Sequence, residues 1–392
     1  MSVKTVNPYT PGAGFAPAFL AGREEMLDRA RSYLENVQNR YPQQPVIYFG
    51  LRGVGKTVLL NAIEEAADNR DMLYHHIEAS EDGHFSARLI GALVRFTSSL
   101  SAHAAAKELS QRVLSMLKAF RVTYNMIENS VEVGVDTSMM ETTGIYADDL
   151  TEIFSTLGKA AYRAGQSVCV FVDEMQCLTE EELAGLASAM HRCNQLRLPV
   201  ILFGAGLPKI RRAVGDARSY AERLFKFEEV SALDDVGTAD AITEPAKDLG
   251  VSYTADAIRE ITAVTEGYPY FIQAFCQTIW DRSEGPEITL EDVRSSQDAF
   301  FAELDCGFFQ VRYNRCSHME QSFMTAMVKC GELPCTISNV AAIMNRKVKS
   351  ISPFRGKLIS KGLIYATGHA EIDFTVPQFD GFIRRINPEL QL

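Results

Sequence analysis

The chain has 392 residues, 46% hydrophobic and 23% charged, a composition typical of a globular protein longer than most single domains. Its formal net charge of −11 argues against a protein that binds nucleic acid over its whole surface, but not against a local basic patch. The first 18 residues lack a signal-peptide pattern, no apolar run reaches the roughly 20 residues of a membrane span, and the eight cysteines contain no Cys-x-x-Cys pair. We therefore expect a cytoplasmic protein of two or three domains with reduced cysteines and no membrane contact.

Helical and strand patterns alternate through the first part of the chain. An extended arm (1–18) precedes an amphipathic helix at 22–41. Strands are expected at 45–50, 72–79, 167–172, 199–204 and 227–230. The segments 45–50, 167–172 and 199–204 are apolar runs typical of buried parallel strands. Helical patterns separate them at 56–69, 86–100, 147–164 and 179–196. This alternation predicts an α/β fold with a mostly parallel sheet. Residues 121–136 alternate loosely, which predicts a β-hairpin, either packed on the domain or offering its tip as a contact surface.

The pattern changes in the last third of the chain. Only helices are expected from 234 to 315. From Ser317 onward we expect a helix, a short helix, a basic helix at 350–364, and two short strands around Gly368.

The segment GLRGVGKT (50–57) matches the phosphate-loop pattern GxxxxGK[ST], between an apolar strand and a helix. Such a loop wraps phosphates with its backbone N–H groups, and the following helix N-terminus favours their negative charge. Lys56 would reach the β- and γ-phosphates, and the Thr57 hydroxyl would bind Mg²⁺. The remaining candidate nucleotide contacts in the loop are Gly50, Gly53, Val54 and Gly55. A glycine-rich turn without a ligand is the alternative.

The apolar run SVCVFVDE (167–174) ends in two acids, which should emerge at the carboxyl edge of a buried strand, where open α/β sheets bind ligands. We expect Asp173 to hold Mg²⁺ through water and Glu174 to orient or deprotonate the attacking water. Two surface acids at a strand end are the alternative. Together with the phosphate loop, the pair predicts Mg²⁺-dependent ATP hydrolysis to ADP.

These motifs resemble the AAA+ branch of P-loop ATPases, in particular the bacterial and archaeal ATPases related to origin-recognition proteins and the neighbouring STAND ATPases. The resemblance rests on FLAGREEML (19–27), GLRGVGKT and FVDEMQCL (171–178). It implies base-side contacts from Phe19, Gly22 and Arg23. The segment FGAGLPKIRR (203–212) takes the sensor-1 position, where Gly204, Ala205 and Gly206 offer no polar side chain.

Two further segments extend the resemblance. SYAERLFKF (219–227) resembles the segment that carries a trans-acting arginine, which makes Arg223 the candidate; a surface ion pair is the alternative. TEGYPYFIQAF (265–275) resembles a Gly-x-Pro motif, and it implies that Pro269 packs near the nucleotide and couples a helical lid to it. Apart from any resemblance, a glycine commonly ends a helix and a proline commonly begins one, so Gly267 and Pro269 predict the end of one helix and the start of the next.

Residues 317–392 resemble a winged helix-turn-helix. They carry nine Lys or Arg against six Asp or Glu, hence +3, which leaves −14 for the rest of a chain of −11. The candidate DNA contacts lie in one acid-free stretch: Arg346, Lys347, Lys349, Arg355, Lys357 and Lys361. Duplex DNA through residues 346–375 is one expected partner. Docking of the basic helix on the acidic body or on a protein effector is the alternative.

The expected organisation is an arm (1–18), a P-loop core (19–233), an all-helical lid (234–315) and a winged helix-turn-helix (316–392). The first hypothesis is a slow ATPase switch, binding ATP or ADP with Mg²⁺, whose nucleotide state controls assembly, including a homo-oligomer, and DNA contact. The second is a STAND-like signalling ATPase with a protein partner. The third is a transposition-helper or phage-defence ATPase with a separately encoded effector.

Overall fold

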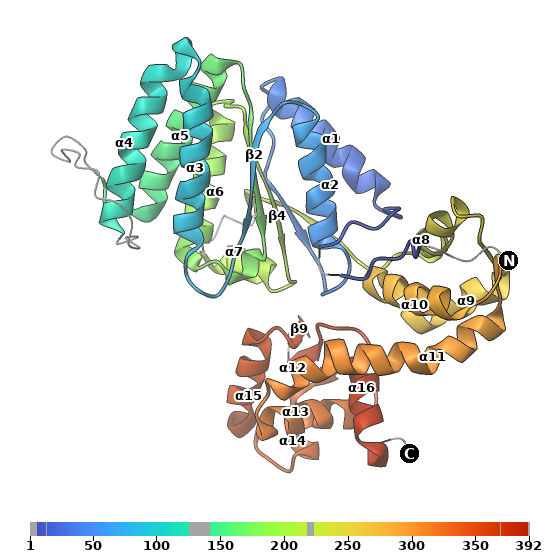
Figure 1. Ribbon diagram of the computed structural model, residues 1–392. Helices are drawn as coiled ribbons and strands as arrows, with labels where there is room; N and C mark the ends of the chain where they lie inside the picture. Colours follow the sequence, from blue (N-terminus) through green and yellow to red (C-terminus); the bar gives the residue numbers. More distant parts are fainter. Residues whose placement is uncertain (1–5, 13, 125–141, 218–222, 369, 391–392) are drawn as a thin grey trace. The chain divides into compact units, whose positions relative to one another are not determined.

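The computed structural model describes residues 6–12, 14–124, 142–217, 223–368 and 370–390 (Figure 1). The chain divides into two units. The core unit comprises Arg23–Gly50 and Gly55–Val230, and the lid unit comprises Met1–Gly22, Leu51–Val54 and Ser231–Leu392. Among the described residues, no helix combines the length and the apolar character that crossing a membrane requires.

The core unit is built on a five-stranded parallel sheet in the order β2-β3-β4-β1-β5. The strands are β1 (Val46–Phe49), β2 (Leu73–Glu78), β3 (Val168–Asp173), β4 (Val200–Gly206) and β5 (Lys226–Glu229). Every residue of β1, β3 and β4 is buried, which is why these strands read as unbroken apolar runs in the sequence. The predicted parallel α/β core is confirmed.

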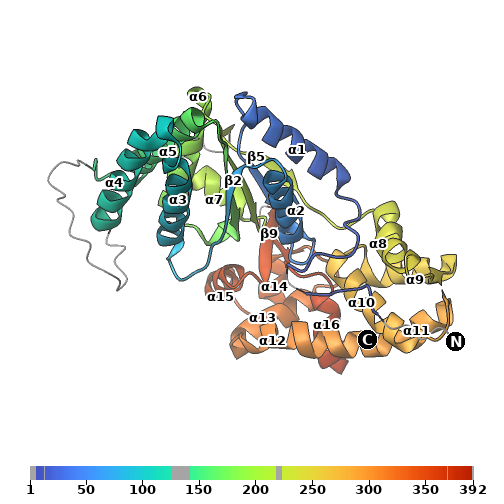
Figure 2. The ribbon, with the colours of Figure 1, turned by 45° about the horizontal axis from the view of Figure 1, so that its top comes forward.

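Helices cover both faces of this sheet, with α1 and α2 on one side and α3 to α6 on the other (Figures 1 and 2). The helices of the core unit are α1 (Glu24–Gln38), α2 (Lys56–Asp68), α3 (Phe85–Ser101), α4 (Lys107–Thr123), α5 (Tyr146–Ala164), α6 (Glu180–Gln195) and α7 (Ile210–Ala217). Short 3-10 turns lie at Ala104–Ala106 and Met175–Cys177. A buried apolar cluster joins α3 to α6 to the sheet. Because neighbouring strands are parallel, their carboxyl ends lie at one edge of the sheet.

The hairpin predicted over 121–136 is wrong at its start, because residues up to Thr123 belong to helix α4. Val113, Leu117 and Phe120 are buried at helical spacing, and this apolar stripe outweighs the loose alternation that follows it. The rest of that prediction, from residue 125 onward, lies outside the described residues.

From Ser231 onward the lid unit contains four main helices, α8 (Asp235–Lys247), α9 (Ala255–Thr265), α10 (Pro269–Arg282) and α11 (Leu290–Leu304). The side chains of Asp234, Thr254 and Thr289 cap three of them. The all-helical expectation for 234–315 is wrong in one detail: β6 (Ser252–Tyr253) and β7 (Glu287–Ile288) form a small parallel pair. Their two-residue length leaves no periodic signal in the sequence.

Helix α11 continues through a π-helical turn (Asp305–Phe309) into α12 (Gln310–Asn314). The C-terminal region then contains α13 (His318–Lys329), β8 (Cys335–Thr336), α14 (Ile337–Ile343), α15 (Val348–Ser360), β9 (Ile364–Gly368), β10 (Glu371–Phe374), α16 (Phe379–Ile386) and a 3-10 turn at Pro388–Leu390. The strands form an antiparallel sheet in the order β8-β10-β9. Strand β8 and helix α16 were not predicted, although Phe379, Phe382 and Ile383 are buried at helical spacing.

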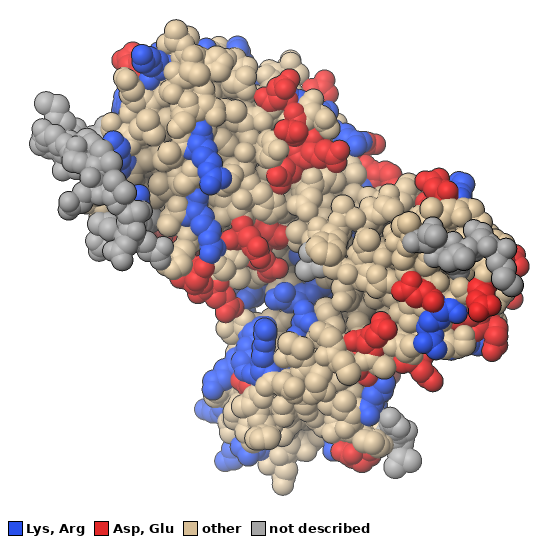
Figure 3. Space-filling view, in the orientation of Figure 1, with Lys and Arg blue, Asp and Glu red and all other residues tan. Residues whose placement is uncertain are grey.

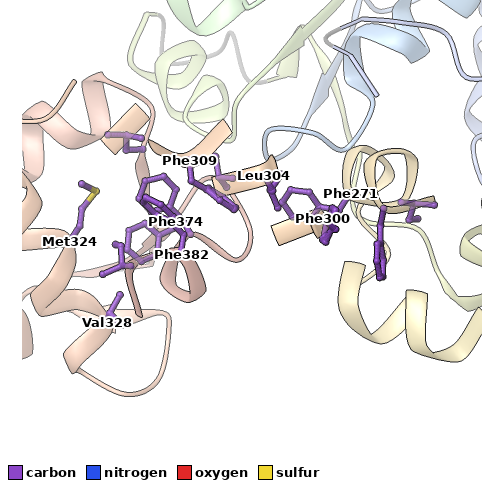
Figure 4. Packing of buried hydrophobic residues seen from close by; sticks show 14 of the residues in the cluster. Phe271, Phe300, Leu304, Phe309, Met324, Val328, Phe374 and Phe382 are labelled. Atoms are coloured by element: carbon purple, nitrogen blue, oxygen red, sulfur yellow. The ribbon is translucent and has the colours of Figure 1, made fainter. Parts of the chain in front are cut away.

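One hydrophobic cluster runs from the lid helices into the C-terminal region. In Figure 4 it extends from Phe271 and Phe300 through Leu304 and Phe309 to Phe382. The N-terminal arm joins the same cluster through Tyr9, which is 1% exposed and donates a hydrogen bond to the Ile242 carbonyl at 2.5 Å. The lid helices and the C-terminal region therefore share a core.

Candidate functional site

The phosphate-loop sequence lies between the end of β1 and the start of α2. Gly53 and Gly55 have φ angles of 84° and 91°, in the left-handed region that side chains disfavour. Gly55 is the residue before the first turn of α2, and no side chain caps that turn. A phosphate oxygen is a suitable acceptor for such a helix N-terminus.

The hydroxyl of Thr57, in the first turn of α2, donates a hydrogen bond of 2.6 Å to Oδ2 of Asp173, the last residue of β3. Asp173 is 5% exposed, and its Oδ1 accepts a 2.7 Å hydrogen bond from the Glu174 backbone N–H. The structure thus brings together the two residues predicted to serve Mg²⁺. A hydroxyl and a carboxylate are oxygen donors of the kind that Mg²⁺ prefers.

Glu174 adopts a left-handed backbone conformation, with φ 52° and ψ 38°, directly after the strand. The left-handed region strains the backbone of any residue other than glycine, and such strained residues often occur at functional sites. The side chain of Gln176 holds Glu174 in place: its Nε2 donates to the Glu174 carboxylate, and its Oε1 accepts from the backbone N–H of Leu207 at 2.8 Å. Gln176 therefore ties Glu174 to the end of β4. The sequence places this glutamine in FVDEMQCL, but the motif alone does not identify it as a site residue.

Steric crowding explains why glycine occupies positions 204 and 206 at the end of β4. A Cβ added at Gly204 would lie 2.0 Å from the sulfur of Met175, and one added at Gly206 would lie 3.0 Å from Oε1 of Gln176. The turn that carries Met175 and Gln176 therefore fills the space that a polar sensor side chain would need.

We expect Gly204→Ser to lower the free energy of unfolding by about 1–3 kcal/mol, because its side chain overpacks the site against Met175. Urea denaturation followed by circular dichroism measures this change. The matched control is Gly215→Ser in α7, where an added Cβ meets nothing within 4 Å. Equal stability of the two variants would contradict this account.

The other predicted nucleotide contacts are divided between the units. Phe19 (37% exposed) and Gly22 (φ 63°) belong to the lid unit, whereas Arg23 is 6% exposed and precedes α1 in the core unit. Arg223 is exposed, and its carbonyl accepts a 2.8 Å hydrogen bond from Gln44 Nε2. The nucleotide contacts of Phe19, Gly22 and Arg23 and the trans-acting role of Arg223 therefore remain predictions.

The Gly-x-Pro segment forms a tight junction in the lid unit. Gly267 has φ 71°, and a Cβ there would lie 2.4 Å from the carbonyl oxygen of Leu233. Its own carbonyl accepts a hydrogen bond from Leu233 N–H at 2.8 Å. Pro269 follows as the first residue of α10. An N–H at this position makes no hydrogen bond within the helix, so proline, which lacks one, costs nothing there.

Residues Leu51–Val54, the middle of the phosphate-loop sequence, belong to the lid unit. The backbone N–H of Tyr270 donates to the carbonyl of Gly53 at 3.2 Å, and the N–H of Arg52 donates to the carbonyl of Thr375, just after β10, at the same distance. One short segment thus contacts the lid helix that Pro269 begins and the C-terminal region. The sequence alone could not predict the second contact, because its two partners, Arg52 and Thr375, are 323 positions apart in the chain.

An aromatic stack supports this junction. The rings of Tyr270 and Phe308 stack at 5.0 Å between centroids, and the guanidinium of Arg312 lies 3.8 Å from the centroid of Phe308. Burial, and then the neighbouring charge of Arg52, lower the pKa of Arg312. The effect of Arg52 on this pKa means that the two guanidinium groups lie close together, so two positive charges meet at the loop segment.

The predicted basic residues of the C-terminal region lie on and beside α15. Arg346, Lys347, Lys349 and Lys357 are exposed, and Arg355 is partly buried. Figure 3 shows Lys and Arg side chains gathered over this part of the C-terminal region.

Lys361 differs from these residues, because its ammonium donates to the carboxylate of Glu320 at 2.7 Å and to the Arg315 carbonyl at 2.9 Å. Burial of Glu320 opposes its ionisation, but the hydrogen bonds from Lys361 and Ser317 outweigh it and hold its pKa below the usual range. Lys361 therefore has an internal structural role.

Comparisons with known proteins agree with this geometry. Residues 20–203 match a family model described as an AAA ATPase domain, and residues 306–383 match one described as a domain of unknown function. A search of curated proteins finds no match. The structure is similar to the Walker-type ATPase of Pyrococcus abyssi (TM-score 0.56, 15% identity, covering 93% of this chain and 96% of the other).

Two further solved structures cover similar shares of the chain. The Orc1 protein of Aeropyrum pernix, solved in complex with DNA, has a TM-score of 0.45 and 13% identity, covering 95% of this chain and 94% of its own. The RuvB Holliday junction branch migration motor of Thermotoga maritima has a TM-score of 0.44 and 15% identity, covering 90% and 92%. The family match and the parallel sheet show that the core has the fold of the P-loop AAA+ ATPases.

Proposed function

We propose that this protein is a Mg²⁺-dependent, slowly hydrolysing ATPase that works as a switch, in which the nucleotide state of the phosphate loop controls assembly and a DNA contact by the C-terminal region. The observation that carries the proposal is the double contact of Leu51–Val54, with Tyr270 in the lid and with Thr375 after β10. Phosphate binding reorganises the backbone of such a loop, so a loop held by both regions would transmit the nucleotide state to them.

Each residue of the site has a separate role in this proposal. Gly50, Gly53, Val54 and Gly55 shape the loop, and Lys56 neutralises the β- and γ-phosphates. Glu174, held by Gln176, orients and deprotonates the attacking water. Arg223, exposed on the core unit, would stabilise transition-state charge in a neighbouring subunit.

The donor set fits Mg²⁺. The Thr57 hydroxyl and the Asp173 carboxylate are already 2.6 Å apart, and both are oxygen ligands. When bound, Mg²⁺ would supply charge neutralisation at the phosphates. The chain's part is to orient these two oxygens and, through the Glu174 N–H bond to Asp173, to hold the carboxylate in one rotamer.

The C-terminal region supports DNA binding through its element order. The order of three helices (α13, α14 and α15) and an antiparallel sheet with the β9–β10 pair supports the proposal of a winged helix-turn-helix, in which the third helix would read DNA. Arg346, Lys347 and Lys349 lie at the N-terminal end of α15, the end that approaches base edges and phosphates in this motif. Arg355 and Lys357 lie further along, whereas Lys361 is left out of the contact set because it pairs with Glu320.

Binding to a fluorescent DNA duplex tests the proposal. With an ATP analogue, Mg²⁺ and increasing salt, we expect affinity to fall steeply, and the combined Arg346→Ala, Lys347→Ala and Lys349→Ala variant to lower the salt slope by about 1 for each lost phosphate contact. Lys118→Ala, an exposed lysine of α4, is the matched control. Affinity that is the same for the triple variant and the control would remove DNA contact by α15 from the proposal.

A second candidate function is a STAND-like signalling, defence or transposition-helper ATPase whose C-terminal region packs internally or binds a protein. The shared hydrophobic core of lid and C-terminal region favours this candidate, because such a core suits a module held in place rather than a mobile reader. A wild-type protein that binds ATP but shows no salt-sensitive binding to the duplex would favour it over the DNA switch.

A further inference from the structure

A pocket of about 710 Å³ lies at the edge of the core sheet where the strands begin. It is formed where helices α1, α5 and α6 end, whereas the phosphate loop follows the end of β1 at the opposite edge of the same sheet. We call it the basic pocket, because four cations line it: Arg40, Lys159, Arg163 and Arg197. Pockets that enclose small molecules span roughly 300–1,000 Å³, so this one has room for a ligand of that size.

The positive charge of the basic pocket has no acidic counterpart in the described parts of the chain. None of the described residues that line the pocket is Asp or Glu, and none of the four cations forms an ion pair with a described acid. All four residues are exposed. Three of them are arginines, whose planar guanidinium groups match the oxygens of a phosphate or a carboxylate. An anion that enters the pocket therefore meets several charged donors at once.

Two of these arginines occupy backbone positions that favour glycine. Arg40 and Arg197 follow the last turns of α1 and α6 with φ angles of 65° and 52°, and each N–H donates to the carbonyl three residues back, at 3.0 and 3.1 Å. Helix α5 ends in the same way with a glycine, Gly165, at φ 70°. A cation in the last turn, such as Arg163 in α5, already stabilises a helix dipole without backbone strain. The helix ends therefore do not explain why both strained positions hold arginine.

The pocket also has an aromatic and apolar surface. Tyr41 is 66% exposed and Tyr162 is 45% exposed, and the Arg40 guanidinium lies 4.0 Å from the centroid of the Tyr162 ring. Leu196, 36% exposed, adds apolar area to the same pocket. Exposed aromatic rings beside cations are the arrangement with which proteins stack nucleotide bases and hold the attached phosphates. The combination fits an anion that also carries a flat aromatic group.

We propose that the basic pocket binds a free nucleotide with two or more phosphate groups, at a second site separate from the phosphate loop. The base would lie against the Tyr41 ring, and Lys159, Arg163 and Arg197 would hold the phosphates. The enclosed volume favours a free nucleotide over a single strand, which would have to continue out of the pocket. Because none of the described lining residues is an acid that could hold Mg²⁺, the site would bind its nucleotide without a metal. This inference goes beyond the proposed function and does not depend on DNA contact or assembly.

Equilibrium dialysis of the full chain with radiolabelled ATP and GTP tests the proposal. In EDTA, the Lys56→Ala variant, which lacks the lysine of the phosphate loop, should still bind one equivalent of either nucleotide, because stacking on tyrosine does not select a base. Added Mg²⁺ should not strengthen this binding, since the metal neutralises the phosphate charge that the pocket recognises. On the same background, Lys159→Ala with Arg163→Ala should weaken binding at least about tenfold, because two charged hydrogen-bond donors are lost.

Two further comparisons make the result specific to the pocket. Lys118→Ala with Arg121→Ala removes the same charge from exposed positions of α4 that do not line the pocket, and should leave binding unchanged. Tyr41→Leu should weaken the binding of ATP and GTP about tenfold but leave that of inorganic triphosphate unchanged, because triphosphate has no base to stack. Circular dichroism of each variant separates a lost site from a lost fold.

Four results would overturn the proposal. A folded Lys56→Ala variant that binds neither nucleotide has no second site, and binding that survives the substitutions of Lys159 and Arg163 lies elsewhere on the molecule. Inorganic triphosphate that binds as tightly as ATP would show that the pocket holds a polyanion without recognising a base. An oligothymidylate that binds more tightly than ATP, and only to the native pocket, would assign the pocket to single-stranded nucleic acid instead.

Discussion

Glu174→Gln is expected to reduce ATP hydrolysis by about 100- to 10,000-fold while ATP binding stays unchanged. The amide keeps the shape of the side chain but cannot accept a proton from the attacking water. The carboxylate is well placed for that task, because it follows Asp173 directly and is held by the Nε2 of Gln176. Phosphate release under single-turnover conditions measures the chemical step, and a fluorescent ATP analogue measures binding.

The matched control is Glu181→Gln, an exposed acid in the first turn of α6 that should leave turnover as it is. Gln176→Ala should give an intermediate loss, because Glu174 remains but is no longer tied to the Leu207 N–H. Hydrolysis by Glu174→Gln at the wild-type rate would show that another group activates the water.

Phe309→Ala is expected to lower the free energy of unfolding of the lid unit by about 3–5 kcal/mol. Phe309 is fully buried in the π-helical turn between α11 and α12. Its ring lies 5.4 Å from Phe382, 5.5 Å from Phe379 and 6.3 Å from Phe271, so its removal leaves a cavity where the lid meets the C-terminal region (Figure 4). Urea denaturation followed by tryptophan fluorescence measures the loss, since Trp280 is the only tryptophan and lies in α10.

Val311→Ala, two residues away and 46% exposed, is the control and should change stability by less than about 0.5 kcal/mol. If the lid and the C-terminal region unfold as one body, hydrogen exchange in α10 and in α16 should speed up together in the Phe309 variant. Faster exchange in α16 alone would mean that the two regions are energetically separate, and would weaken the proposed path from Tyr270 and Thr375 to the C-terminal helices.

The coupling proposed here depends on three parts of the chain that meet at four loop residues. Gly267 and Pro269 fix the start of α10, which places the Tyr270 N–H at the Gly53 carbonyl. The end of β10 places the Thr375 carbonyl at the Arg52 N–H. Because these bonds use the backbone, the contact depends on how the loop is folded rather than on the identity of its side chains.

The sequence alone was sufficient for the phosphate loop, the acidic strand end and the parallel core. Each of these depends on local chemistry: glycines that allow positive φ, a lysine and a threonine at a helix start, and apolar runs long enough to be buried on both faces. The same holds for the helices at 86–100 and 147–164, whose apolar periodicity the structure reproduces in α3 and α5.

Only the tertiary structure decided the features that depend on residues far apart in the chain. It extended α4 through Thr123, because Val113, Leu117 and Phe120 bury one face. It showed that Gly204 makes room for Met175, that Gln176 connects Glu174 to β4, and that Lys361 neutralises the buried Glu320. Packing and hydrogen bonding between distant segments depend on the folded geometry. A local sequence pattern therefore does not predict which distant residue fills a space or accepts a hydrogen bond.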